Sequence, residues 1–292
     1  MDVFSIVSLL YFVGLPLVAT MSKQYTSVPI KLGIGALSWI VAAGILSFTK
    51  NLAGTLFLGI PWLQTAYLPL LMTIPFYLYQ KPKEFLSQIV RDYKQLLMIT
   101  LIVLVLSWLI KPLPTVKFEN QLTRVTTSSL TPPYQGVGKR EYELVNDYGA
   151  ELLVSYMGVI VHSQSKSYQI IFFLMLTCLG IMLLETLRNI KIGWLVMMGL
   201  GLILLTLAGE LVIFGDVINW MLIMVGWIIL AWLLKRDSIV LSGIILLGLL
   251  TIHSGATLWW VMPSLLVIAP YRLALCVGIA ILINPLVIGN IR

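Results

Sequence analysis

The chain has 292 residues, of which 59% are hydrophobic and only 11% are charged, and its formal net charge is +7. A soluble core could not enclose that much apolar surface, so the composition excludes an ordinary soluble domain and indicates a helical membrane protein. Most of the positive charge lies in short gaps between apolar runs, which is typical of membrane flanks in contact with anionic lipid rather than of a nucleic-acid-binding surface.

Apolar runs of the length needed to cross a bilayer recur along the whole chain. About nine or ten transmembrane helices are predicted, at residues 3–20, 32–48, 53–79, 96–110, 169–187, 193–213, 217–234, 239–252, 257–270 and 272–290. Residues 239–290 hold either three spans or two spans and a re-entrant segment. The expected fold is therefore an all-α polytopic membrane bundle. It has an N-terminal membrane region at 1–110, an extracytoplasmic loop region at 111–168 and a C-terminal membrane region at 169–292.

The sign of charge alternates from one gap to the next, which predicts the orientation. Every second gap is basic: Lys23 with Lys31, then Lys81, Lys83, Arg91 and Lys94, then Arg188 and Lys191, then Lys235 and Arg236, then Arg272. Because Lys and Arg are retained on the cytoplasmic side during insertion, we expect the N-terminus and residues 111–168 to lie outside. Lys50 and Arg292 fit this pattern least well.

The long apolar run at 53–79 contains Pro61, Pro69 and Pro75. Proline removes a backbone donor and clashes with the preceding turn, so these three residues are candidate positions for a broken helix. A broken membrane helix can expose backbone groups to a substrate or an ion. The alternative is a short interfacial entry followed by one kinked span.

Residues 81–95 form an amphipathic pattern, with Phe85, Leu86, Ile89, Val90 and Tyr93 on one face. Charged and amide side chains, Asp92 among them, take the other face. This pattern is typical of a helix that lies in the cytoplasmic interface of the membrane. Contact with lipid suffices to explain it, although the helix could also bind a cytoplasmic partner.

The segment 111–168 is the only sizeable stretch that is expected to face water. Val116, Phe118 and then Leu122 indicate short strand-like stretches, and the apolar stretch from Tyr142 to Val161 is expected to fold back onto the membrane surface. Its six basic and five acidic residues nearly cancel, so no nucleic-acid binding is predicted. We expect it to pack on the spans or on another subunit, which makes it the predicted surface for protein partners.

Polar side chains at membrane depth are candidate functional residues, because an ionisable group in hydrocarbon is costly. The candidates are Glu210, Asp216, His253 and Asn284. Glu210 and Asp216 bracket an expected outer turn, where solvation at the level of the lipid headgroups would lower their cost. Glu185 lies three residues before Arg188 and is interpreted as a structural pair.

The sequence contains no recognisable catalytic motif and predicts no cofactor and no metal site. Cys178 and Cys276 lie in apolar runs, so we expect packing residues rather than a disulfide. The functional hypothesis is a membrane subunit of transport or translocation type, channel-lining or scaffold, in a prokaryotic plasma membrane. The alternative is a membrane enzyme that acts on lipid or peptide at the outer face, where Glu210, Asp216 and His253 would have to converge.

Overall fold

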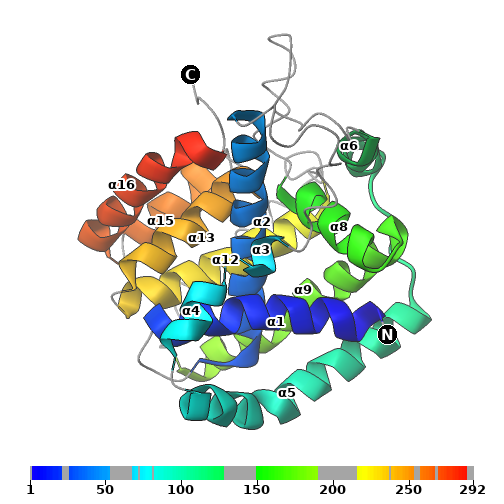
Figure 1. Ribbon diagram of the computed structural model, residues 1–292, viewed down its shortest axis with the longest axis horizontal. Helices are drawn as coiled ribbons and strands as arrows, with labels where there is room; N and C mark the ends of the chain where they lie inside the picture. Colours follow the sequence, from blue (N-terminus) through cyan, green and yellow to red (C-terminus); the bar gives the residue numbers. More distant parts are fainter. Residues whose placement is uncertain are drawn as a thin grey trace.

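The structure is a computed structural model that describes residues 2–21, 26–52, 68–71, 73–80, 82–127, 149–189, 216–236, 238–252, 257–266 and 269–287. These residues form helices and contain no strand, which confirms the predicted all-α class (Figure 1). Three of the described helices are long and apolar enough to cross a membrane, at Asp2–Thr20, Gln164–Glu185 and Val217–Lys235. The apolar helices indicate a membrane-embedded protein, with fewer helices of full spanning length in the described part than the sequence predicts.

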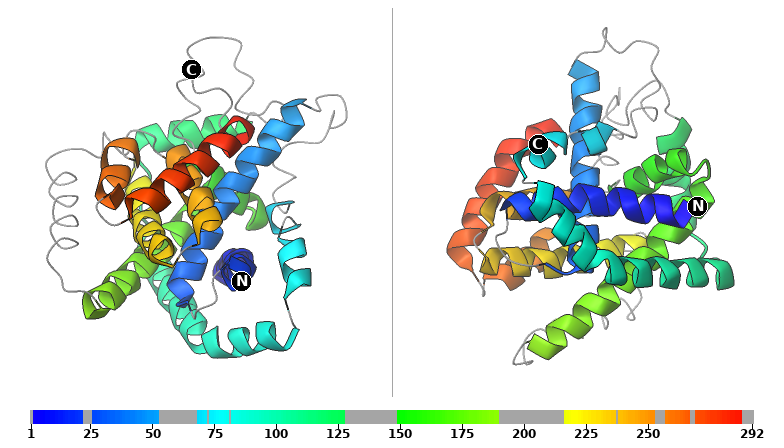
Figure 2. Two further views of the ribbon diagram at one scale, coloured as in Figure 1. Left: turned by 90° about the vertical axis from the view of Figure 1, so that its left-hand side faces the viewer. Right: turned by 60° about the horizontal axis from the view of Figure 1, so that its bottom comes forward.

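The central helix is α2 (Val28–Leu52), which packs against α1 (Asp2–Met21), α12 (Val217–Lys235) and α13 (Ile239–Ile252). Its Trp39 is fully buried. Both views in Figure 2 show α1 and α2 crossing steeply rather than running side by side. Glycine permits this close crossing, because a Cβ on Gly14 would collide with the backbone oxygen of Lys31, and one on Gly35 with that of Leu10.

Two predicted segments are joined in one helix, α5 (Pro82–Leu109). It combines the amphipathic stretch 81–95 with the apolar stretch 96–110, and it lies at the edge of the molecule (Figure 1). Asp92 was expected on the exposed polar face, but it is buried. That expectation is wrong because the amphipathic pattern does not reveal that a cation on α2 meets Asp92 from the inner side.

The run at 53–79 is described only at its end, as the short helices α3 (Leu68–Leu71) and α4 (Ile74–Tyr79). Thr73 stands between them, Pro69 lies in α3 and Pro75 in the first turn of α4. Proline is tolerated in a first turn because the N–H that it lacks would have no partner there. Pro61 lies outside the described residues.

The strand-like stretches expected after residue 111 are absent from 111–127, where the structure has α6 (Val116–Thr127) instead. Phe118 and Leu122 are four residues apart, so they share one helical face, and that face is buried. Helix α8 (Gly149–Ile160) packs against α6, α2 and α9 (Gln164–Asn189). Because residues 149–158 are all buried, the expectation that this stretch lies on the membrane surface is also wrong.

The C-terminal region begins with α13, whose bounds match the predicted span at 239–252. A π-helical turn η2 (Thr257–Val261), the short helix α15 (Met262–Leu266) and α16 (Pro270–Val287) follow. Residues 257–266 rise about 15 Å as a helix, half of a hydrocarbon core of about 30 Å. Two hydrogen bonds join these residues to α12 and α13: Trp227 Nε1 donates to Ser264 Oγ (2.8 Å), and Thr257 Oγ1 donates to Leu249 O (3.0 Å).

Candidate functional site

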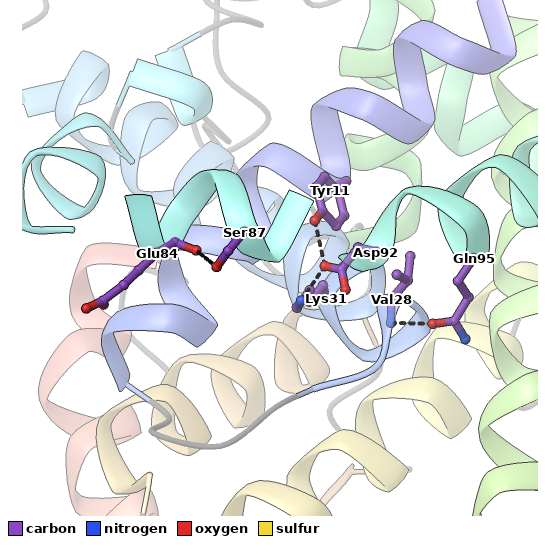
Figure 3. Close-up of polar contacts among 7 residues, drawn as sticks. All are labelled: Tyr11, Val28, Lys31, Glu84, Ser87, Asp92 and Gln95. Carbon is purple, nitrogen blue, oxygen red and sulfur yellow. Dashed lines mark hydrogen bonds and ion pairs between the residues drawn. The ribbon is translucent and has the colours of Figure 1, made fainter. Parts of the chain in front are cut away.

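Three helices meet at a buried ion pair between Lys31 of α2 and Asp92 of α5. Only 2% of the Lys31 side chain is exposed and none of the Asp92 side chain. Tyr11 of α1 donates its hydroxyl to Asp92 Oδ2 at 2.6 Å. Figure 3 shows Tyr11 and Lys31 pointing toward the same carboxylate. We call these three residues the Asp92 cluster, and it ties α1, α2 and α5 together.

Further polar contacts surround the first turn of α2, next to the Asp92 cluster. The side-chain oxygen of Gln95 accepts a hydrogen bond from the backbone N–H of Val28 at 3.2 Å (Figure 3). The hydroxyl of Ser27 donates to Glu185 Oε2 of α9 at 2.8 Å. The first N–H groups of a helix have no partner within the helix, so a side-chain acceptor there stabilises the helix start. Glu185 therefore has a structural contact, to Ser27.

A second buried carboxylate, Asp216, is the N-cap of α12 and is 1% exposed. Its Oδ1 accepts from the backbone N–H of Ile218 at 3.1 Å and from the hydroxyl of Tyr168 at 2.8 Å. Its Oδ2 accepts from the backbone N–H of Thr115 at 2.8 Å. We call Asp216, Tyr168 and Thr115 the Asp216 cluster. It connects α12, α9 and the segment between α5 and α6.

The position of Asp216 explains how its carboxylate is accommodated. A helix N-terminus carries partial positive charge and free N–H groups, so aspartate is among the preferred N-cap residues. The ring of Tyr168 also packs edge-on against Phe118 of α6, with 5.3 Å between ring centroids. The expected solvation of Asp216 by headgroups is wrong, because protein donors surround it and its side chain is buried.

Several contacts show which segments share one end of the molecule. Lys166 and Asp2 form an exposed ion pair at 3.3 Å, and the side-chain amide of Gln169 donates to Ile110 O at 2.7 Å. Together with the Asp216 cluster, these contacts show that the start of α1, the end of α5 and the start of α9 lie at the same end of the molecule. The Ser27–Glu185 and Gln95–Val28 contacts lie toward the other ends of α9 and α5.

Of the four polar candidates from the sequence, Asp216 alone has a described side chain. Glu210 and His253 lie outside the described residues, so their proposed convergence with Asp216 remains a prediction. Asn284 lies in α16, but its side chain is outside the described part. Cys178 and Cys276 are free and buried, as expected for packing residues.

The sequence reasoning missed the Asp92 cluster and a buried glutamate, Glu151. Lys31 stands directly before an apolar run, and Glu151 is the one acidic residue of the apolar stretch 149–161. Both are ionisable groups close to membrane-type sequence, and this signal could have found them.

Within the described part, no three His, Cys, Asp or Glu side chains gather closely enough to hold a metal ion. No known protein family, no curated protein and no solved structure matches this chain. What the two clusters do chemically is clear: each fixes the relative positions of helices that are far apart in the sequence.

Proposed function

We propose that the chain is a membrane subunit of transport or translocation type, channel-lining or scaffold, that works within a larger complex. The observation that carries this proposal is the use of its buried acids. Asp92 and Asp216 both accept hydrogen bonds from donors on other elements, and Asp92 is also neutralised by Lys31. Groups held in this way join helices and are poorly placed to change partner during turnover.

The geometry of Asp216 weighs against the alternative of a membrane enzyme at the outer face. A general acid or base must reach the proton that it transfers. Both oxygens of Asp216 are engaged by protein donors, and its side chain is 1% exposed. A scaffold role uses this arrangement as it stands, whereas catalysis would require the cluster to open.

The proposal includes an orientation: the N-terminus, the 111–168 region and Asp216 lie outside, in a prokaryotic plasma membrane. The alternating basic gaps predict it. Asp2 contacts Lys166, and Asp216 contacts Thr115. These contacts support the proposal that the N-terminus, the 111–168 region and Asp216 lie on the same side of the membrane. We further propose about nine or ten membrane segments, with 257–266 as a re-entrant one because it is too short to cross.

The partner surface is proposed to include the outward face of α6. Its inner face is anchored, since Phe118 and Leu122 are buried and Thr115 is held by Asp216. Val116 is 75% exposed, and Asn120, one helical turn later, is also exposed. Deleting residues 120–160 would remove the buried helix α8 and damage the fold, so surface substitutions on α6 are the cleaner test.

The test is purification of the tagged full-length chain from its native membrane in mild detergent. We expect other proteins to copurify in stoichiometric amounts with the unchanged chain and to be lost with Val116→Arg/Asn120→Arg. Ser87→Arg, at an exposed position of α5, serves as the control and should retain them. Recovery of the unchanged chain without any stoichiometric partner would refute the proposal of a complex subunit.

A further inference from the structure

The outer face of α5 carries the longest run of exposed apolar side chains in the described part of the chain. In the stretch 97–109, eight large hydrophobic residues are exposed: Leu97, Met98, Leu101, Ile102, Leu104, Val105, Trp108 and Leu109. Ile99 and Val103 are buried on the opposite side. At about 100° per residue, the exposed side chains cover an arc of about 160° around the helix. We call this the α5 apolar arc.

The width of the α5 apolar arc indicates what covers it. A single partner helix contacts a narrow stripe of side chains, of the a and d type. An arc of about 160° is wider than one such stripe and suits a fluid apolar solvent. Residues 95–110 contain no charged residue, and the part of α5 from Lys94 to its end at Leu109 rises about 22 Å. That length approaches the hydrocarbon thickness of a bilayer, about 30 Å.

Charged side chains stand at one end of the same face. On the same helical projection, Lys83, Lys94 and Arg91 fall within the α5 apolar arc, one or more turns toward the helix N-terminus, and all three are exposed. Glu84 is the one acidic residue on that face, so the net charge there is +2 (three cations and one anion). Asp92 falls on the opposite side and is neutralised by Lys31.

We propose that the outer face of α5 binds anionic phospholipids, with acyl chains along the α5 apolar arc and phosphates beside Lys94, Lys83 and Arg91. The long stems of lysine and arginine can lie along apolar surface while their charges reach the headgroups. Attraction of cations to an anionic leaflet supplies the selectivity. This inference rests on the proposed membrane location, but it does not depend on the proposed protein partners.

The first experiment measures lipid selectivity. The full-length protein is reconstituted in nanodiscs of phosphatidylcholine and phosphatidylglycerol, released in mild detergent, and examined by native mass spectrometry for retained lipid. We expect phosphatidylglycerol to be preferred, and each cation removed in Lys83→Gln/Lys94→Gln to lower that preference about fivefold. Lys117→Gln removes an exposed cation on α6 and should leave the preference unchanged. An unchanged preference in the double variant overturns the proposal.

The second experiment asks whether lipid or protein covers the α5 apolar arc. A spin label is attached at Leu101→Cys in a chain with Cys178→Ala and Cys276→Ala, in its native membrane. High accessibility to oxygen with low accessibility to a water-soluble nickel chelate is expected for acyl chains. Low accessibility to both reagents would show that a protein covers the arc and would overturn the lipid proposal. The copurification test is independent of these two experiments. If no protein copurifies, the proposal of a complex subunit fails, but the lipid selectivity and the spin-label accessibility still test lipid binding by α5.

Discussion

The Asp92 cluster and the Asp216 cluster both bury a carboxylate among apolar helices, but they stabilise its charge differently. Asp92 lies in the interior of α5, where the helix offers no free donors, and it is met by the cation of Lys31. Asp216 lies at a helix start and accepts hydrogen bonds from two backbone N–H groups and a tyrosine hydroxyl, and it forms no ion pair within the described part of the chain. The comparison teaches that position along a helix decides whether a buried acid needs a counter-charge.

The largest expected effect comes from separating the ion pair of the Asp92 cluster. Asp92→Ala leaves the Lys31 charge buried without its partner, and we expect a loss of about 3–5 kcal/mol in the free energy of unfolding. Reversible unfolding by SDS in mixed micelles measures it. Replacing both partners, in Asp92→Leu/Lys31→Met, should recover most of the loss. If the single and the double variants are equally destabilised, the unpaired charge of Lys31 is not the cause of the lost stability.

Removal of the Asp216 carboxylate should cost less, because no opposite charge is left behind. We expect Asp216→Ala to lose about 2–3 kcal/mol, from the missing N-cap and from the unsatisfied donors on Tyr168 and Thr115. The same unfolding measurement applies. A loss as large as that of Asp92→Ala would contradict the distinction between the two clusters.

The close crossing of α1 and α2 should also contribute to the free energy of unfolding, because Gly14 lies against the backbone of Lys31. Gly14→Ala pushes a methyl group against the backbone of Lys31, and overpacking of this kind costs about 1–3 kcal/mol. Gly180→Ala is the matched control, because nothing lies within 4 Å of the added Cβ. Because alanine favours a helix more than glycine does, Gly180→Ala should be neutral or stabilising, by up to about 1 kcal/mol. Equal destabilisation by both substitutions would show that close approach is not the cause.

The smallest expected effect is the loss of one hydroxyl donor from the Asp216 cluster. Tyr168→Phe keeps the ring contact with Phe118 and removes the bond to Asp216, for which we expect about 1.5 kcal/mol. The effects of Tyr168→Phe and Asp216→Ala on the free energy of unfolding should be less than additive, because both substitutions remove the same hydrogen bond. A double-mutant cycle should therefore give a measurable coupling energy between Tyr168 and Asp216. The absence of a coupling energy would contradict the hydrogen bond.

The sequence predicts helix positions well where apolar runs are uninterrupted, as for α12 and α13, because the length of an apolar run sets the length of a helix. It fails where a pattern has two meanings. Phe118 and Leu122 fit an alternating strand nearly as well as a helical face, and only the packing on α8 distinguishes them. Local pattern assigns Asp92 to the polar face in the same way.

The candidate site was partly predictable. The cost of burying an acid singled out Asp216. Its partners could not be found, because Tyr168 and Thr115 lie 48 and 101 residues away in the chain. Lys31 is 61 residues from Asp92, and Tyr11 is 81. Such pairings depend on how helices cross, which the periodicity of a single segment does not encode.

The central claim is that the chain spans the membrane, with the Asp216 cluster toward the outer side and the Asp92 cluster toward the cytoplasmic side. Cysteine labelling in intact cells tests it most directly. Lys117→Cys and Lys83→Cys are each introduced, one at a time, into the chain with Cys178→Ala and Cys276→Ala. Both positions are exposed, on α6 and on α5. We expect a membrane-impermeant maleimide to label Lys117→Cys in intact cells and Lys83→Cys only after permeabilisation. Labelling of both positions in intact cells, or the reverse order, would contradict it.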